Sequence, residues 1–526
     1  MKNARNLLSG LLVMVMMVVL LSGCSSKPDG SSNTSTTPST TTSTTTSTSE
    51  STETSDSGNT DATLDTSKQV ELVLYVMGTE PNKQQEMNDN LNKLLLEKFN
   101  CTLKINWVGW SDYANKYPLL FSSGEEFDMA YAASWLNFPS LAQKGAFMKL
   151  DELWPTYAPD NFALQSETAK SQATIDGHYY AVPTLFASYS AYGPIYRTDI
   201  MEGTEWNGEM NNFDDMEAYL DIVKANNPEL EPLEIYSSGS EIDEIFIHYN
   251  SIYPSKGATN DFLFLDPKEE NPTFFTYYEY EKTPEFLDMM ARWNQKGFYP
   301  KSALSDTDPS KTQNGKAAIR VHNIDTYQGY YIDHPEWKFK FSNFATDISN
   351  MSFTQDAMVI SNTSKHPELA MAVYNYLTTD EEAYRAFQWG IEGTSYRITE
   401  DNQLEMLNTD DYAQSSMWAA RNSQFHLETA GSPADIKEFK ADFDNRIKDG
   451  VGIQKYRSFV IDTSSIETEY AACQNVHQQY WWPLELGYTD VKTGLEEYKQ
   501  KMQAAGVDKV KEVLQQQLNE YVANLK

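Results

Sequence analysis

The sequence predicts an α/β fold built on mostly parallel sheets flanked by helices. Residues 70–77 (VELVLYVM) form an almost continuous apolar run rich in branched side chains, which is typical of a strand covered on both faces. Two further strands are expected at 102–108 and 127–131, each separated from its predecessor by helical sequence. Such strand–helix–strand alternation predicts parallel strands joined by crossover helices.

The predicted helices are marked by apolar spacing and by residues that start or stop helices. The first opens at Glu80-Pro81, and its apolar positions through Phe99 follow the spacing of one buried face. Another begins near Pro367, and the next has the spacing of a capping box at 379–382 and ends at Gly390. A long amphipathic helix, apolar at helical intervals over 510–525, closes the chain.

The charge balance excludes one class of partner. The 526 residues contain 41 Lys and Arg against 75 Asp and Glu, which gives a net charge of −34. Phosphate-binding surfaces need the opposite balance, so we expect no nucleic acid partner. The three cysteines exclude a disulfide-stapled scaffold. Cys101 and Cys473 are either bonded to each other or two separate buried thiols, and their spacing does not decide between these.

The N-terminal residues predict export and a lipid anchor. Lys2 and Arg5 precede an apolar run at 7–21, which is too short to span a bilayer but suits a signal peptide. The sequence at 21–24 (LSGC) resembles the lipobox of bacterial lipoproteins, in which the cysteine is acylated after cleavage. We therefore expect a signal peptide at 1–23 and lipid on Cys24, which holds the protein at the outer face of a Gram-positive type of cell membrane.

A tether follows the predicted anchor at 24–67. Between residues 25 and 67, Ser and Thr account for 28 of 43 positions, and no residue is aromatic. Such a segment cannot bury enough apolar surface to offset its ordering entropy, so we expect disorder. A glycosylated stalk is the alternative.

Motifs for cofactors, metals and nucleophiles are lacking, so we expect neither a cofactor nor a metal. The turn after the first strand has neither GxGxxG nor a Walker lysine, and the seven histidines include no pair at ligand spacing. HExxH, CxxC and GxSxG do not occur.

An ordered set of motifs resembles one protein family. Several segments are similar, in order, to extracellular solute-binding proteins of the maltose-binding type, and in particular to a large-lobed branch found among lipoproteins of Gram-positive bacteria. Single motifs are weak, but their order spans roughly residues 69 to 521. The segments are 175–183 with 196–200, 314–318 (NGKAA), 374–380, 390–396, 459–466 (FVIDTSSI) and 504–509.

The resemblance implies a two-lobed fold of the periplasmic-binding-protein type II, with the ligand cleft between the lobes. Connections between the lobes are expected near 181–192 and again near 344–353. The first lobe is expected to comprise 68–190 plus about 350–388, and the second 191–349 plus about 389–490. Residues 491–526 are expected to form C-terminal helices.

The resemblance also implies a function without covalent chemistry. The protein is expected to be a monomer with no enzymatic activity. It is expected to capture a carbohydrate, with an oligosaccharide as the leading ligand, by closing its lobes, and to deliver it to permease subunits of an ABC importer. Other small polar solutes stay open as ligands, because one scaffold accepts several solute classes. Two alternatives are a secreted glycan-acting hydrolase and a cell-surface sensor or adhesin that uses the same cleft.

The candidate ligand-binding residues combine aromatic rings with polar side chains. Flat rings stack on the C–H faces of sugars, and neighbouring carboxylates bond hydroxyl groups. We expect Trp135 and Trp389 to clasp a sugar ring, and the glycines around Glu392 suggest a close backbone approach there. For any single Trp, a place in the core is the alternative. The full set is Glu80, Trp110, Ser134, Trp135, Tyr192, His322, Trp389, Glu392 and Asp462.

Overall fold

The computed structural model describes residues 64–110, 113–236, 242–255, 261–412, 417–448 and 451–525. All of them belong to one compact unit, Ala62–Lys526. The predicted signal peptide, Cys24 and nearly all of the predicted tether lie outside the described residues. Within these ranges, no helix combines the length and the apolar character that crossing a membrane requires.

The first sheet has five strands in the order β2-β1-β3-β14-β6. The three predicted strands are found as β1 (Val70–Met77), β2 (Cys101–Val108) and β3 (Met129–Ala132), and β1 pairs with both neighbours in parallel. β14 (Ala357–Ile360) is antiparallel to both of its neighbours, β3 and β6 (Val182–Pro183), so β6 runs in the same direction as β1, β2 and β3. Four of the five strands in this sheet therefore run in one direction, as expected of a mostly parallel sheet, and β14 runs against them where the chain returns from the second sheet.

Helices that pack on the first sheet complete the first lobe. The predicted first helix begins at Gln84 and not at Glu80, and the second begins at Pro367 as predicted. The capping box was misplaced by one residue, because the Asp380 side chain accepts a hydrogen bond from the backbone of Ala383. The helices are α1 (Gln84–Phe99), α2 (Tyr113–Ser122), α3 (Phe138–Gln143), α4 (Leu153–Tyr157), α5 (Pro159–Leu164), α6 (Glu167–Gln172), α11 (Pro367–Thr379), α12 (Glu381–Trp389) and α13 (Thr409–Tyr412).

The second sheet has four strands in the order β13-β7-β12-β8. β7 (Tyr192–Tyr196) lies between β12 (Ala317–Asn323) and β13 (Lys340–Phe341) and is antiparallel to both. β8 (Glu231–Leu233) pairs with β12 in parallel, so β13, β12 and β8 run in one direction, and β7 is the one strand of this sheet that runs against them. Gly193 permits the close approach, because a Cβ there would lie 1.8 Å from the Ser342 carbonyl oxygen.

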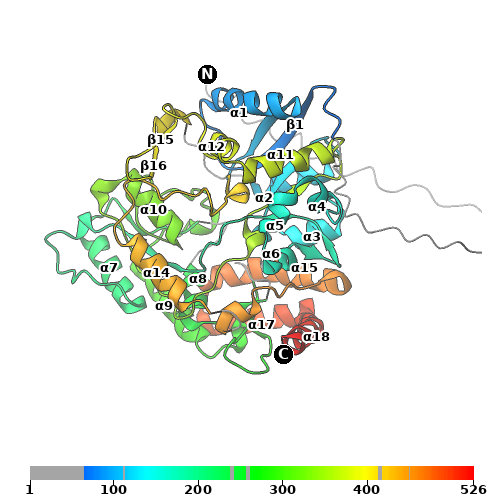
Figure 1. Cartoon of the computed structure of the whole chain (residues 1–526). Helices are drawn as coiled ribbons and strands as arrows, with labels where there is room; N and C mark the ends of the chain where they lie inside the picture. The colour runs from blue at the N-terminus through cyan, green and yellow to red at the C-terminus, as the bar shows by residue number, and fades with distance from the viewer. Residues whose placement is uncertain are drawn as a thin grey trace, which may run out of the picture. The chain divides into compact units, whose positions relative to one another are not determined.

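Helices and short strands surround the second sheet and form the second lobe (Figure 1). The predicted long C-terminal helix is found as α18, with Val510, Leu514, Leu518 and Val522 buried on one face. The remaining helices are α7 (Phe213–Asn226), α8 (Ile242–Asn250), α9 (Thr283–Lys296), α10 (Ile324–Asp333), α14 (Ile436–Arg446), α15 (Glu467–Val476), α16 (Trp482–Glu485), α17 (Val491–Ala505) and α18 (Val507–Asn524). The short strands of this lobe are β9 (Tyr253–Pro254), β10 (Leu263–Leu265) and β11 (Phe275–Thr276). β4 (Thr174–Ile175) and β5 (His178–Tyr179) pack on the first lobe, and β15 (Tyr396–Ile398) and β16 (Leu404–Met406) form a small cluster with α12.

Each lobe has its own hydrophobic core. Cys101 is buried in the core of the first sheet and Cys473 in the core of the second, and both thiols are free. Burial raises the pKa of each thiol to about 12. Residues 417–420 pack into the first core. The predicted lobe boundaries, 68–190 plus 350–388 and 191–349 plus 389–490, stay a prediction.

Three connecting segments run between the sheets. The first two follow β6 and precede β14, as expected, and the sequence did not locate the third, which begins at Arg421. Tyr189 pairs with Asn350 in an antiparallel bridge, and Leu185 pairs with Asn422 in a parallel one. The backbone of Thr184 also donates to the Asp356 carbonyl at 2.9 Å. These bonds tie the three segments to one another.

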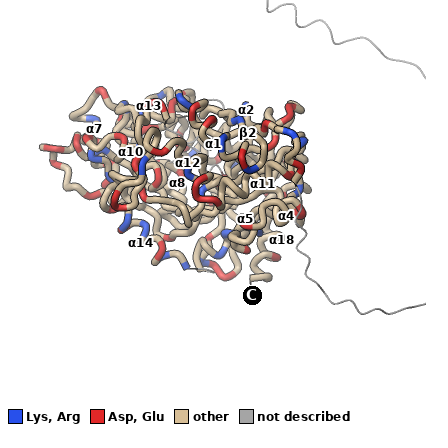
Figure 2. Tube along the Cα trace, turned by 45° about the horizontal axis from the view of Figure 1, so that its top comes forward, with Lys and Arg blue, Asp and Glu red and all other residues tan. Residues whose placement is uncertain are grey.

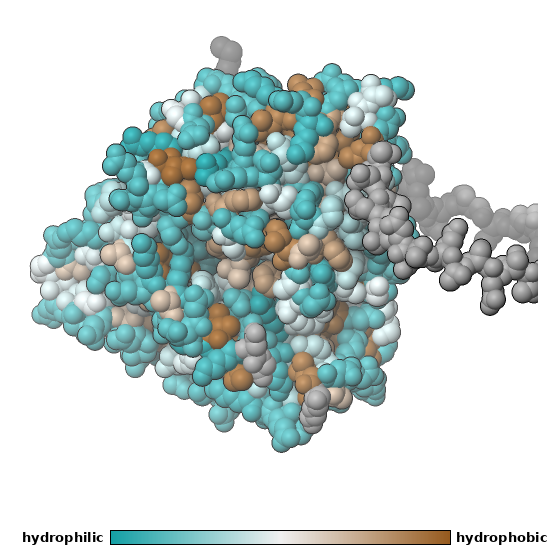
Figure 3. All heavy atoms as spheres, in the orientation of Figure 1, coloured by the Kyte–Doolittle hydropathy of each residue, from teal (hydrophilic) through white to brown (hydrophobic). Residues whose placement is uncertain are grey.

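The surface is polar and carries mixed charge. In the view of Figure 2, Lys and Arg are interspersed among more numerous Asp and Glu residues and form no continuous basic stripe. Hydrophilic residues cover most of the face in Figure 3, and hydrophobic residues occur there in small groups. The mixed charge in this view agrees with the net charge of −34.

Candidate functional site

A cavity of about 720 Å³ lies between the lobes. Its size is within the range of small-molecule binding sites. The first lobe contributes Trp110, Tyr113, Trp135 and Gln172, and the second contributes residues of β7, β12, α8 and α10. The connecting segments also line it, through Ser188, Ser190, residues 349–352 and residues 354–356. A ligand in this cavity therefore contacts both lobes and the segments between them.

Aromatic rings form the wall on the first lobe. Trp110 follows the carboxyl end of β2, and Trp135 lies just after the carboxyl end of β3, so parallel strands bring the two together. Their ring centroids are 6.2 Å apart, and Trp418 lies 5.8 Å from Trp110. Trp135 Nε1 donates to the Gln355 carbonyl at 3.2 Å, which fixes its indole against a connecting segment. The three tryptophans are each partly exposed and offer flat faces to a ligand.

The opposite wall is built on β7 and β12 of the second lobe. Tyr192 begins β7 and stacks on His248 of α8, with centroids 5.4 Å apart and planes at 4°. His322 of β12 lies 5.9 Å from the same ring, because the register pairs β12 with β7 at this point. His322 Nδ1 is 2.7 Å from the Thr326 hydroxyl. This wall presents hydrogen-bonding groups across from the tryptophans.

Two acidic residues of the first turn of α8 also line the cavity. Asp243 and Glu244 are both more than nine-tenths buried, and Glu485 of α16 is buried behind them. Burial, together with the charges of Glu485 and Glu244, holds the pKa of Asp243 well above its ordinary value. Glu244 Oε2 lies 3.4 Å from His248 Nε2, whereas its Oε1 has no hydrogen-bond partner among the described residues.

Arg421 connects the lobes at the cavity. Its Nη2 donates to Asp356 Oδ2 at 2.8 Å, and its Nη1 lies 3.7 Å from Asp325 Oδ2 of α10. The guanidinium also lies 4.5 Å from the ring centroid of Phe186 on the first connecting segment. Arg421 therefore contacts the first two connecting segments and a helix of the second lobe.

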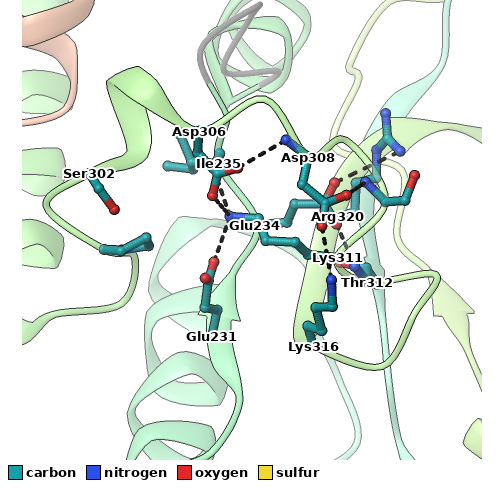
Figure 4. Close-up of polar contacts among 12 residues, drawn as sticks. Glu231, Glu234, Ile235, Ser302, Asp306, Asp308, Lys311, Thr312, Lys316 and Arg320 are labelled. Atoms are coloured by element: carbon teal, nitrogen blue, oxygen red, sulfur yellow. Dashed lines mark hydrogen bonds and ion pairs between the residues drawn. The ribbon is translucent and has the colours of Figure 1, made fainter. Parts of the chain in front are cut away.

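A buried lysine holds a loop that lines the cavity (Figure 4). Lys311 Nζ donates to Glu231 Oε2 at 2.7 Å, to Asp306 Oδ2 at 2.9 Å and to the Ile235 carbonyl at 3.0 Å. Burial alone lowers the pKa of Lys311, but the bonds to Glu231 and Asp306 outweigh it and raise that pKa. The loop at 306–316 places Pro309, Ser310 and Gln313 at the cavity.

Arg320 of β12 secures the same loop. Its Nη1 donates to the Pro309 carbonyl at 2.6 Å and to the Tyr330 hydroxyl at 3.0 Å. The carboxylate of Glu234 lies 3.9 Å from that nitrogen and accepts a bond from the Thr312 backbone at 2.6 Å. Arg320 lines the cavity, but its donors already serve the protein.

The structure brings five of the nine predicted site residues together. Trp110 and Trp135 lie on the aromatic wall, and Tyr192 and His322 lie on the opposite wall. Ser134 lines the cavity beside Trp135 and is 3.4 Å from the side-chain oxygen of Gln355. Glu80, Trp389, Glu392 and Asp462 do not line it.

Trp389 was expected to clasp a sugar but lies in a separate small core. It is 7% exposed and packs edge-on against Tyr384 and Tyr396, with centroids 5.7 and 5.4 Å away. The neighbouring Gly390 has φ 89° and ends α12, where a Cβ would lie 2.8 Å from Met87 Cε. This glycine therefore serves a helix end and not a ligand.

The three carboxylates outside the cavity are exposed. Glu392 lies in the turn between α12 and β15, and Glu80 lies in the loop after β1. Asp462 accepts bonds from the Gln143 side chain at 3.1 Å and from the Ser464 backbone at 2.8 Å. Its carboxylate therefore joins α3 to the start of a turn.

Sequence reasoning missed several cavity residues. Trp418, Arg421 and Asp325 come from segments that are far apart in the chain and meet only in the fold. Glu244 lies beside Asp243 in the first turn of an otherwise apolar helix of the second lobe, where acids are common and do not indicate a binding site. Nothing in the local sequence around these residues marks them as part of a site.

Within the described residues, no group of three or more His, Cys, Asp or Glu side chains is arranged to hold a metal ion. The residues that line the cavity present aromatic faces, carboxylates, guanidinium groups, imidazoles and hydroxyls. These groups bind and orient a polar ligand by stacking and hydrogen bonding.

The sequence matches two families. Residues 82–384 match the family described as bacterial extracellular solute-binding protein, and residues 455–523 match a domain of unknown function, DUF3502. A relative named carbohydrate ABC transporter substrate-binding protein, from Streptococcus pneumoniae serotype 4, is 25% identical over 490 residues. The match covers 89% of this chain and 94% of that relative.

Solved structures share the fold. The N-glycan transport solute binding protein NgtS from Streptococcus pneumoniae, in complex with Man1GlcNAc, superposes with a TM-score of 0.75 at 21% identity and covers 86% of this chain and 100% of that one. The substrate binding protein FusA of S. pneumoniae, in complex with kestose, gives 0.62 at 15% identity and covers 87% and 100%. These likenesses confirm the predicted two-lobed α/β fold.

Proposed function

The chain belongs to the bacterial extracellular solute-binding proteins, and from this premise we propose that it captures an oligosaccharide in the cavity between its lobes and delivers it to permease subunits of an ABC importer. The observation that carries the proposal is the aromatic wall of Trp110, Trp135 and Trp418. Three adjacent indoles offer stacking area to more than one sugar ring, and the opposite wall offers partners for hydroxyl groups.

The names of the relatives support the same ligand class. One is a carbohydrate transporter component, and the two solved structures hold Man1GlcNAc and kestose. The cavity here combines the two features that sugar recognition needs, flat apolar faces and convergent polar groups. Ligand contacts to both lobes favour the closed arrangement, so the binding free energy shifts the population toward a form that the permease recognises.

Calorimetric titration of a glycan panel that includes Man1GlcNAc and kestose tests the proposal. Trp418→Ala removes a stacking face and should weaken binding by about 2 kcal/mol, as for anchor aromatics elsewhere. The matched control is Trp337→Ala, because Trp337 is partly exposed but lies outside the cavity. Absence of binding to every glycan, or equal affinity of the wild type and Trp418→Ala, would contradict the proposal.

We further propose that the protein is anchored by lipid on Cys24 at the outer face of the cell membrane. The support is the sequence around Cys24, which follows an apolar run and small residues. Cys24→Ala should release the protein from membranes or leave an unprocessed precursor. Recovery of mature wild-type protein entirely in the culture medium, without detergent, would contradict the anchor.

We also propose that the protein acts as a monomer. We propose further that the sugar leaves the cavity chemically unchanged. Family membership supports a binding role. A glycosidase would instead hold two carboxylates at a set separation across the scissile bond. Chromatography of the glycan after prolonged incubation tests whether the sugar is cleaved. A shortened product that the wild type forms and the Glu244→Gln variant does not would indicate hydrolysis.

A further inference from the structure

The charged groups of the cavity are unbalanced toward acid. Among the described residues that line it, carboxylates outnumber guanidinium groups, and no lysine is present. The carboxylates are Glu244, Asp325, Asp333 and Asp356, with Asp243 besides, whose raised pKa favours its neutral form, and the guanidinium groups are those of Arg320, Arg421 and Arg457. The field of the whole chain, with its net charge of −34, has the same sign.

The terminal nitrogens of the three guanidinium groups are engaged by the protein itself, whereas Nε of Arg421 is buried without a hydrogen-bond partner among the described residues. Arg421 is bonded to Asp356 and lies close to Asp325. Arg457 donates to the Asn350 side chain at 3.1 Å and to the Met351 carbonyl at 3.0 Å, and it covers the ring of Phe353.

Arg320 serves the loop at 306–316 and lies 3.9 Å from the Glu234 carboxylate. A ligand carboxylate would therefore have to displace existing partners to bond the terminal nitrogens that these arginines present, and Arg421 Nε is itself buried. In a partly desolvated site, contact with the remaining acids is unfavourable for an anion.

Glu244 points to the kind of group that the cavity takes. The residue is 5% exposed and lines the cavity, and its Oε1 has no hydrogen-bond partner among the described residues. A buried carboxylate oxygen without a donor is unfavourable, so a ligand that supplies one gains more than an exposed contact would give. Sugar hydroxyl groups are donors, whereas a ligand carboxylate at neutral pH is an acceptor only.

We propose that the cavity selects neutral oligosaccharides over acidic ones, and that Glu244 is a specificity-determining residue that accepts a hydrogen bond from a sugar hydroxyl. This inference rests on the proposed function. It divides carbohydrate ligands by charge: glycans of neutral hexoses and N-acetylhexosamines bind, and chains of uronic acids are rejected.

The test compares neutral and acidic glycans of equal length on the full-length chain in detergent at pH 7.5 and low salt. The probes are a mannose oligomer, an N-acetylglucosamine oligomer and a mannuronic acid oligomer, and the readouts are the calorimetric Kd and the shift of the unfolding midpoint. At least one neutral probe should bind ten times or more tightly than the acidic probe. An acidic glycan that binds as well as every neutral one overturns the selectivity but leaves glycan capture intact. No binding by either class overturns both.

Variants assign the selectivity to Glu244. Glu244→Gln keeps the size of the side chain and removes its charge, so the preference for the neutral probe should fall at least fivefold. The matched control is Glu285→Gln, which makes the same change on α9 at an exposed position outside the cavity. Equal preferences in Glu244→Gln and Glu285→Gln would overturn the role of Glu244, provided that both variants melt within a few degrees of the wild type. If Glu244→Gln does not fold, Asp325→Asn, at a half-exposed acid, should lower the same preference, and an unchanged value there overturns the acidic selectivity.

Discussion

The guanidinium of Arg421 donates to the carboxylate of Asp356 at 2.8 Å, and this bond joins two of the three segments that connect the lobes. The side chains of Arg421 and Asp356 are only 15% and 9% exposed. Tyr131 also donates to Asp356, at 2.7 Å. The relationship is therefore a mostly buried, hydrogen-bonded ion pair at the boundary between the lobes.

Arg421→Met should destabilise the protein, because it leaves Asp356 buried with Tyr131 as its one remaining side-chain donor among the described residues. We expect the free energy of unfolding to fall by about 3 kcal/mol, as when one partner of a buried pair is removed. Denaturant titration measures this. The control is Arg397→Met, which removes an exposed pair with Glu405 and should cost less than about 1 kcal/mol. Equal losses of unfolding free energy in the two variants would show that the buried pair of Arg421 and Asp356 stabilises the protein no more than an exposed pair does.

His426 should make stability fall as the pH drops from 6.5 toward 5. Burial, and then the charges of Lys440 and Arg421, lower the pKa of His426 to about 4. The unfolded chain therefore takes up a proton near pH 6.5 that the folded chain refuses, and stability is complete only above that pH. After discounting for partial exposure, we expect a loss of about 1 to 2 kcal/mol by pH 5.

Urea titrations of the wild type and His426→Gln at pH 7.5, 6 and 5 measure this contribution. The variant should lose less stability over this range, since its side chain does not titrate. Glu217 does not take up a proton in this pH range. The hydrogen bonds that Glu217 accepts, first among them the one from Arg292, hold its pKa at about 2. Parallel losses in both proteins would contradict the assignment to His426.

Lys311→Met should affect both stability and binding. The variant removes the cation between Glu231 and Asp306, which are each partly exposed, so we expect a loss of about 2 to 3 kcal/mol in the free energy of unfolding. Glycan affinity should fall too, because the loop at 306–316 lines the cavity. Lys316→Met is the control, since its pair with Asp308 is exposed and should cost less than about 1 kcal/mol. A normal Kd in Lys311→Met would show that the loop keeps its place without the lysine.

Trp389→Ala should destabilise the protein without weakening binding. The indole is buried between Tyr384 and Tyr396, so its removal leaves a cavity and should cost about 3 to 5 kcal/mol. Unfolding titrations and calorimetry on the same sample separate the two effects. A large loss of glycan affinity in a variant that is still folded would place Trp389 in the site after all.

Local patterns in the sequence predicted much of the first lobe. The apolar run at 70–77 and the helix start at Pro367 were found as predicted, because propensity and burial act over short stretches there. The antiparallel entry of β14 was not predictable, since it depends on a connection that passes through the other lobe. The motifs that resemble a known family supplied the two-lobed arrangement, which periodicity alone does not contain.

The candidate site was only half predictable for a related reason. Trp110 and Trp135 follow the carboxyl ends of parallel strands, where ligands of open sheets bind, and this rule can be read from the sequence. Trp418 and Glu244 reach the cavity through tertiary packing, and nothing in their neighbours marks it. Glycines flank Glu392 as they would flank a ligand contact, but Gly390 ends a helix against Met87.

The connecting segments predict a measurable closure of the lobes. They are bonded to one another at Tyr189–Asn350 and Leu185–Asn422, so bending is expected to concentrate there while each lobe keeps its own core. A neutral glycan that saturates the cavity should therefore reduce the radius of gyration in small-angle X-ray scattering. Trp418→Ala, at a glycan concentration that saturates only the wild type, should keep the radius of the unbound protein. An unchanged radius in wild-type protein that calorimetry shows to be saturated would mean that ligand capture here proceeds without closure.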